Sequence, residues 1–126
     1  MKSIIVSMAV AAGLMVAGSA LAVDMPALAK KNNCNACHAI DHKVVGPAWM
    51  DVSKAYNSNG ATTTGKKVAD ILKENNAKTA EEWLQVKVSK GGTGNWGKAA
   101  MIANDPKGTK QADIKELVAF VMGLAK

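Results

Sequence analysis

The residues with the clearest chemical pattern are Cys34 and Cys37, which are separated by two residues and followed at once by His38. Two thiols at this spacing can form thioether bonds to the two vinyl groups of one haem, while the imidazole beside them binds the iron. A redox-active dithiol would need a βαβ pattern, which the chain lacks. Zinc would need two further ligands, and His42 lies too close to His38 for the usual spacing. The motif therefore predicts covalent haem c, with His38 as an axial ligand.

An iron-binding histidine needs an acceptor for the N–H group on its other ring nitrogen. Pro47 is a candidate, because its backbone carbonyl is available and Gly46 lets the chain pass close to a haem face. Alternatively, this Gly-Pro pair only starts a helix, since proline is common in first helical turns. The sequence gives the two readings about equal weight.

The opposite face of the iron needs a second axial ligand, and the candidates after residue 22 are Met25, Met50, Met101, Met122 and His42. Met25 precedes the first expected helix, and packing inside helices explains Met50 and Met122. Met101 lies in a long glycine-rich stretch without periodicity, which could fold over a haem. Position therefore favours Met101. A loop methionine without a ligand role is the alternative, and His42 is more simply a surface histidine.

The stretch around Met101 contains two further features. Gly91-Gly92-Thr93-Gly94 has the glycine content of a phosphate loop, but it follows an expected helix rather than a strand and lacks the Lys-Ser/Thr pair. Trp96 could donate its indole N–H to a haem propionate, although filling an apolar cluster would explain it nearly as well.

The elements that must position these residues are helices, because the apolar residues follow helical rather than alternating spacing. We expect an all-α domain with about five helices around the haem. The first should begin near Asp24 or Met25 and carry the cysteines at its end. The others are expected from Pro47 to Asn57, from a Thr64 cap to Asn75, from a Thr79 cap to about Lys90, and from a Thr109 cap to Leu124.

Four of these helices have predicted inward faces. Trp49, Val52 and Tyr56 share one face of the second helix, and Val68, Ile71 and Leu72 lie on the inner side of the third. Trp83 and Val86 should be buried in the fourth, with Leu84 or Val88 as further candidates. The last helix has a continuous apolar stripe, made by Ile114, Leu117, Val118, Val121 and Leu124. This stripe should pack on the first helix.

The first 22 residues have the features of an export signal: Lys2, an apolar run over residues 4–16, and the small-residue ending Ala20-Leu21-Ala22. The apolar run is too short for a lasting membrane span. We expect residues 1–22 to be cleaved off and residues 23–126 to form one small domain. Such a domain gains stability from a large apolar cofactor at its centre.

Charge and composition narrow the range of partners. All 16 basic residues are lysines against 10 acidic residues, and removal of Lys2 leaves 15 − 10 = +5. This balance favours acidic protein partners. Nucleic-acid binding is disfavoured, because the chain has no arginine and few aromatic residues to stack on bases.

Two segments carry a family resemblance. The run from Cys34 to Gly46-Pro47 resembles the haem-binding segment of the class I cytochromes c, in particular the short bacterial c-551/c-552 subgroup. Residues 94–104, Gly-Asn-Trp-Gly-Lys-Ala-Ala-Met-Ile-Ala-Asn, resemble the methionine loop of that subgroup. Residues 23–126 would then be a cytochrome c domain.

The resemblance implies site roles for several residues. Met101 would be the sixth ligand, Pro47 would accept a hydrogen bond from His38, Trp96 would approach a propionate, and Asn104 would lie near the methionine sulfur. Lys87 falls near the position where the family often has a propionate-facing arginine.

The chain also departs from the family pattern at two places. The prolines that usually flank the methionine are replaced by Ala100, Ile102 and Ala103, which puts the rigidity of the loop in question. The central segment, residues 57–80, is longer than in the subgroup.

A haem iron with both axial positions filled by protein is left to cycle between its ferric and ferrous forms. We therefore expect a monomeric single-electron carrier in the bacterial periplasm, not an enzyme, without stable membrane insertion. Its partners would be redox proteins with acidic surfaces: a terminal oxidase, a nitrite reductase, a peroxidase or a bc-type complex. The main alternative is an open-site haem enzyme or gas-binding haem protein in which Met101 dissociates. A third reading is a haem module of a larger reductase complex.

Overall fold

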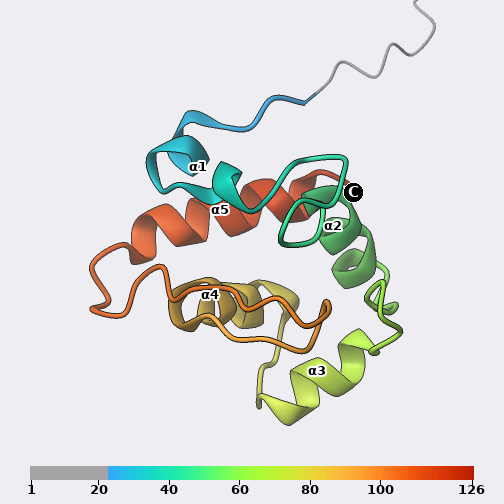
Figure 1. Cartoon of the computed structure of the whole chain (residues 1–126). Helices are drawn as coiled ribbons and strands as arrows, with labels where there is room; N and C mark the ends of the chain where they lie inside the picture. The colour runs from blue at the N-terminus through green and yellow to red at the C-terminus, as the bar shows by residue number, and fades with distance from the viewer. Residues whose placement is uncertain (1–22) are drawn as a thin grey trace, which may run out of the picture.

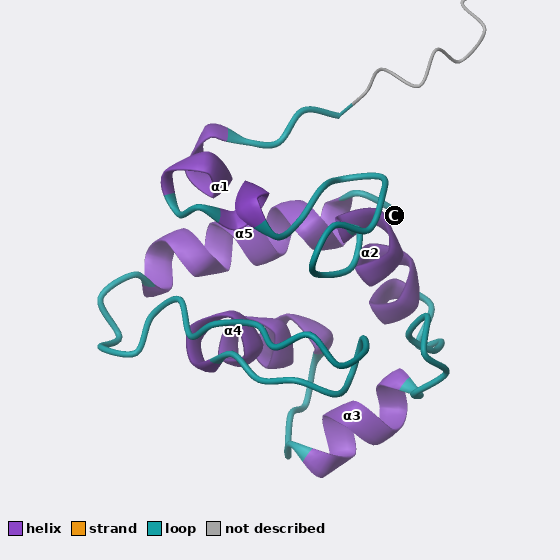
Figure 2. Ribbon diagram, viewed as in Figure 1, coloured by secondary structure: helices purple, strands orange, loops and turns teal. Residues whose placement is uncertain are grey.

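The computed structural model describes residues 23–126, so the expected export signal at residues 1–22 lies outside the described residues. This part of the chain contains helices and no β-strand beyond isolated bridges (Figures 1 and 2). The elements are α1 (Ala27–Lys31), the 3₁₀ turn η1 (Cys34–Ala36), α2 (Trp49–Asn57), α3 (Val68–Glu74), α4 (Ala80–Lys90) and α5 (Gln111–Gly123). The predicted all-α fold with five helices is confirmed. Within residues 23–126 no helix has both the length and the apolar character that crossing a membrane requires.

Helix α5 is the element on which α1, α2 and α4 pack. Ile114, Leu117, Val118 and Val121 are all buried, as their spacing predicts. The helix contacts α1, α2 and α4, and Figure 1 shows α1 lying beside it. The N- and C-terminal helices are therefore packed together, which was predicted from the apolar stripe.

The N-terminal helix is shorter than predicted and does not carry the cysteines. Pro26 is extended, with ψ 150°, so α1 begins only at Ala27. Asn33 has a φ of 59°, a left-handed conformation that ends helices. The cysteine motif consequently starts a separate 3₁₀ turn, in which the chain changes direction relative to α1.

Helix α4 is capped as predicted but turned differently. The Glu82 backbone N–H donates to the Thr79 hydroxyl at 3.1 Å, and the Glu82 carboxylate accepts from the backbone N–H of Lys78. The inner side of the helix includes Trp83 and Leu84, whereas the side chain of Val86 is 39% exposed. The inward orientation of Val86 was therefore wrong, because the buried face is centred nearer Leu84.

The caps predicted for the third and fifth helices were also wrong. Helix α3 begins at Val68 and lacks a side-chain cap, while the Thr64 hydroxyl donates to the backbone carbonyl of Asn95 at 3.0 Å. Helix α5 begins at Gln111, and Thr109 does not cap it. The carboxylate of Asp105 accepts instead from the backbone N–H groups just before the helix.

Candidate functional site

A cavity of about 350 Å³ lies among α2, α4, α5 and the loops that follow η1 and α4. The helices contribute apolar walls, made by Trp49, Val52, Leu84, Leu117, Val118 and Val121. Its size falls within the range of small-molecule and cofactor sites. Their helical spacing predicts that these residues face inward on separate helices, and in the structure they surround one apolar space.

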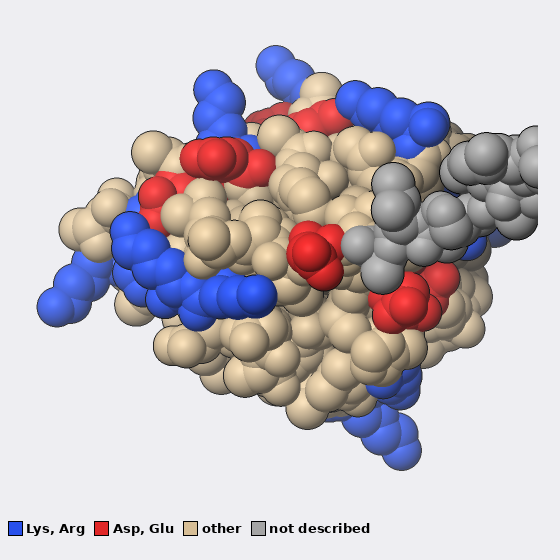
Figure 3. All heavy atoms as spheres, turned by 90° about the horizontal axis from the view of Figure 1, so that it is seen from above, with Lys and Arg blue, Asp and Glu red and all other residues tan. Residues whose placement is uncertain are grey.

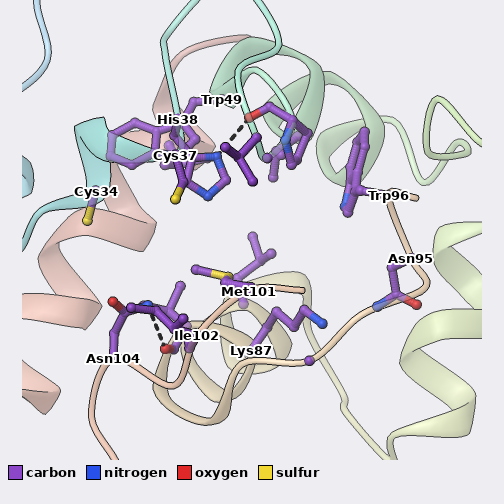
Figure 4. Close-up of a pocket in the computed structure, with 18 of the residues that line it drawn as sticks. Cys34, Cys37, His38, Trp49, Lys87, Asn95, Trp96, Met101, Ile102 and Asn104 are labelled. Atoms are coloured by element: carbon purple, nitrogen blue, oxygen red, sulfur yellow. Dashed lines mark hydrogen bonds between the residues drawn. The ribbon is translucent and has the colours of Figure 1, made fainter. Parts of the chain in front are cut away.

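The cysteine motif forms one wall of this cavity (Figure 4). The backbone N–H groups of Cys37 and His38 donate to the carbonyl of Cys34 at 3.2 and 2.9 Å, which holds the motif in a tight turn. Both thiols are free, with Cys34 half-buried and Cys37 exposed. Burial raises the pKa of the Cys34 thiol, whereas a redox-active dithiol needs a lowered pKa.

The imidazole of His38 is held in one orientation by Pro47. Its Nδ1 lies 2.8 Å from the Pro47 carbonyl oxygen, which can only accept, so Nδ1 carries the proton. Burial lowers the pKa of His38, and the hydrogen bond to Pro47 opposes that shift. The ring is therefore neutral near pH 7, with the lone pair of Nε2 free for a metal.

Gly46 is required by the close approach of the chain to this imidazole. A Cβ atom at position 46 would lie 2.5 Å from Cε1 of His38. Its backbone N–H also donates to the carbonyl of Cys37 at 2.8 Å. Gly46-Pro47 is thus more than a helix-starting turn, since α2 begins two residues later at Trp49.

Met101 faces His38 from the opposite wall (Figure 4). It is the one methionine among the described residues that line this cavity. Its backbone pairs with Gly92 through two hydrogen bonds of 2.8 and 3.0 Å. A Cβ atom at Gly91 would collide with the Met101 carbonyl, so glycine is needed there as well.

The other ligand candidates from the sequence lie elsewhere. Met122 is buried in the core, and Met25 and Met50 line a separate hollow near the start of the domain. His42 is exposed, and its Nδ1 lies 2.7 Å from the carboxylate of Asp41. None of these four side chains lines the cavity.

Three further expected residues line the same cavity. Trp96 is half-buried and packs against the apolar core. The side-chain amide of Asn104 donates to the backbone carbonyls of Val88 and Ile102, both at 3.2 Å, so it joins the methionine loop to α4. Lys87 extends from α4 toward the same space (Figure 4), and burial lowers its pKa, as does the nearby charge of Lys66.

Sequence reasoning missed several residues that line the cavity, among them Val45, Asn95 and Lys110. It also missed the hydrogen bond of 3.1 Å from the Trp83 indole to the Tyr56 hydroxyl. No local pattern marks Val45, Asn95 or Lys110 as cavity residues, because it is the folding of the chain that brings them to the cavity. The Tyr56 and Trp83 positions had been assigned inward faces, which was the only available signal.

The donor set fits a covalently held haem. A neutral imidazole and a thioether lie on opposite walls of an apolar space, and two free thiols lie beside the imidazole. A helical domain with this arrangement belongs to the class of small proteins that carry a c-type haem.

Comparison with known proteins gives the family. The cytochrome c family profile matches residues 22–125. Cytochrome c-551 of Allochromatium vinosum is 37% identical over 88% of this chain and 95% of the relative, and cytochrome c-552 of Nitrosomonas europaea is 35% identical over 90% and 89%. The crystal structure of wild-type Nitrosomonas europaea cytochrome c552 matches with a TM-score of 0.58 and 33% identity, over 77% of this chain and 95% of that chain.

The chain therefore belongs to the cytochrome c family, as a class I monohaem c-type cytochrome of the c-551/c-552 subgroup. Its cofactor is haem c, bound covalently. The family is one of electron-transfer proteins.

Proposed function

We propose that this chain is an exported single-electron carrier in which Cys34 and Cys37 attach the haem and His38 and Met101 bind its iron. The observation that carries the proposal is that the free Nε2 side of a neutral imidazole and a thioether face each other from opposite walls of one apolar cavity (Figure 4). When bound there, haem supplies a one-electron couple between ferric and ferrous iron.

The residues of the chain would keep the iron in one coordination state as it gains and loses an electron. Pro47 fixes the imidazole through its carbonyl, and Met101, on the opposite wall of the cavity, would bind the iron and exclude outside ligands. Trp96 and Lys87 are proposed to meet the propionate edge, and Asn104 to hold the loop next to the methionine sulfur. If His38 and Met101 both bind the iron, no open position would remain for a substrate, so we assign no enzymatic activity.

The proposed location is the periplasm of a bacterium, reached by cleavage of residues 1–22. Support comes from the charged, apolar and small-residue pattern of this segment. The mature chain, residues 23–126, would act as a soluble monomer.

The proposed partners are redox proteins with acidic surfaces, such as a terminal oxidase, a nitrite reductase, a peroxidase or a bc-type complex. The lysine excess supports this choice. On the face shown in Figure 3, acidic side chains lie among the lysines, so this face is not a uniformly basic patch. Apolar side chains at the cavity, including Val45 and the 73% exposed Ile102, would supply short-lived contact with a partner.

One observation favours an open-site haem protein as a second candidate. Residues 91–105 contain no proline, and Gly91, Gly92, Gly94 and Gly97 all have positive φ angles. A loop of this composition has many conformations available when it is released, which would favour dissociation of Met101.

Visible spectra of the purified holoprotein, with and without carbon monoxide, distinguish the two candidates. The carrier proposal expects low-spin haem with the weak far-red methionine-to-iron band, and a reduced form that carbon monoxide leaves unchanged. Met101→Ala should abolish the band and admit the gas. A wild-type ferrous protein that is high-spin and binds the gas promptly would contradict the carrier proposal and support the open site.

A further inference from the structure

The loop that carries Met101 is anchored firmly at its base. Met101 pairs with Gly92 through two backbone hydrogen bonds. The backbone N–H groups of Asn104 and Asp105 donate to the carbonyls of Val88 and Ser89 at the end of α4, both at 3.1 Å. These contacts hold residues 101–105, but not the far end of the loop.

At the far end, residues 93–100, Trp96 packs against the core, but the hydrogen bonds of this segment are mainly internal. The Thr93 hydroxyl points at the carbonyls of residues 97–99, and Gly94 N–H donates to Gly97. From another part of the described chain, the Thr64 hydroxyl donates to the backbone carbonyl of Asn95 at 3.0 Å. Thr64 belongs to the central segment, residues 57–80, to which no role has been assigned.

The Thr64 hydroxyl is itself held in place by a chain of donors. Each hydroxyl has one proton, and Thr64 uses its proton on Asn95. The contact of 3.0 Å between Oγ1 of Thr62 and Oγ1 of Thr64 must then be a donation by Thr62. Oγ1 of Thr62 in turn accepts from the backbone N–H of Lys66 at 3.2 Å. The donors therefore all point the same way, from Lys66 through Thr62 and Thr64 to Asn95. Hydrogen bonds in such a chain polarise and strengthen one another.

The start of this series is part of a well-packed turn. Thr62 is only 4% exposed, and its backbone N–H donates to the carbonyl of Lys66 at 2.9 Å. The next helix begins with Val68, which is 1% exposed and donates to the carbonyl of Gly60 at 2.8 Å. The tether therefore joins the methionine loop to a fixed part of the fold.

We propose that Thr64 is a positioning residue: through Asn95 it holds the far end of the methionine loop and thereby keeps Met101 over the iron. The central segment would in this way restrain a loop that lacks proline. Asn95 precedes Trp96 and lies six residues before Met101, and all three line the cavity. This inference rests on the proposed function where it assigns Met101 to the iron.

The test compares Thr64→Val, which keeps the shape but removes the hydroxyl, with Thr64→Ser, which keeps the hydroxyl. Thr63→Val is the matched control, because Thr63 is an exposed neighbour whose hydroxyl makes no hydrogen bond within the described residues. Amide hydrogen exchange of residues 95–100 in the holoprotein measures the tether directly. The rate at which the ferrous protein binds carbon monoxide, and the temperature at which the far-red band disappears, measure the hold on Met101.

For Thr64→Val we expect exchange at residues 95–100 and the carbon monoxide rate to rise by about three- to tenfold, as loss of one neutral hydrogen bond predicts. The far-red band should disappear at a lower temperature. Thr64→Ser keeps the hydroxyl, so its exchange, carbon monoxide rate and band temperature should stay close to the wild-type values. Thr63→Val should behave as the wild type.

Two outcomes would overturn the inference. One is a Thr64→Val protein with wild-type exchange at residues 95–100, and the other is equal loss in the valine and serine variants. A third outcome is that Thr64→Val raises exchange as expected, while the wild type itself lacks the far-red band. The tether then exists, but Met101 is not the iron ligand. That result would overturn the proposed function and, with it, the role of Thr64 in iron ligation.

Discussion

At the scale of the single residue, the most constrained position in the site is Gly46. The imidazole of His38 occupies the space where a side chain would begin, while Nδ1 must stay 2.8 Å from the Pro47 carbonyl. One methyl group therefore forces the ring to turn or the chain to move. Either change redirects the nitrogen proposed to bind iron.

Gly46→Ala should destabilise the holoprotein by about 1–3 kcal/mol, which is the usual cost of overpacking a tight site. It should also change the spectrum of the ferric haem, because His38 is displaced. Denaturant unfolding and visible spectroscopy measure the two effects. Gly123→Ala is the control, since nothing lies within 4 Å of a Cβ atom there and alanine favours helix. A Gly46→Ala protein with wild-type stability and spectrum would mean that the ring adapts freely.

At the scale of the element, helix α5 depends on a carboxylate that precedes it. Asp105 is buried, and its two oxygens accept from the backbone N–H groups of Thr109 and Lys110 and from the side chain of Gln111. Burial alone would raise the pKa of Asp105. The pKa is nevertheless lowered, because these hydrogen-bond donors favour the charged form. The group thus fixes both the end of the methionine loop and the start of α5.

The lowered pKa determines a pH dependence. A depressed carboxyl pKa stabilises the fold above the pKa of the unfolded state, and this contribution is lost as pH falls through the folded-state pKa. Asp105→Asn should therefore lower the melting temperature by several degrees near pH 7. The difference in melting temperature between the variant and the wild type should disappear as the solution is made acidic below about pH 4. Thermal unfolding over pH 2–7 measures this difference in melting temperature, and a difference that stays constant with pH would contradict the prediction.

The helices also show how far pattern alone leads. The inward faces of α2 and α5 and the Thr79 cap of α4 were predicted correctly, because each depends on residues within a few positions of one another. The Thr64 and Thr109 caps were wrong. A threonine hydroxyl bonds whichever partner tertiary folding brings near, and for Thr64 that partner is 31 residues away.

At the scale of the whole molecule, the feature proposed to govern the choice of redox partner is the lysine excess. The mature chain would have a net charge of +5, from 15 lysines and 10 acidic residues. Opposite charge on a partner accelerates encounter, and salt screens this attraction over about 8 Å at physiological ionic strength.

Electron transfer to an acidic redox partner should therefore slow as salt is added, by about tenfold or more between low and physiological ionic strength. Stopped-flow measurement with a purified acidic oxidase or reductase measures the bimolecular rate. A basic redox protein serves as the control, for which added salt should raise the rate. If the bimolecular rate with the acidic partner does not change with salt, recognition does not depend on charge, and the prediction is wrong.

The sequence by itself determined the chemistry of one side of the site. Cys34, Cys37 and His38 are adjacent, so their joint use with haem could be read without a fold, and helical spacing set which apolar residues turn inward. Position in the loop and the family resemblance already favoured Met101, but only tertiary structure brought this side chain opposite His38 and determined what restrains the loop that carries it. Met101 lies 63 residues from His38, and the Thr64 tether joins loops that share no local pattern. Contacts of this kind arise from how helices pack, and local spacing contains no information about packing partners far along the chain.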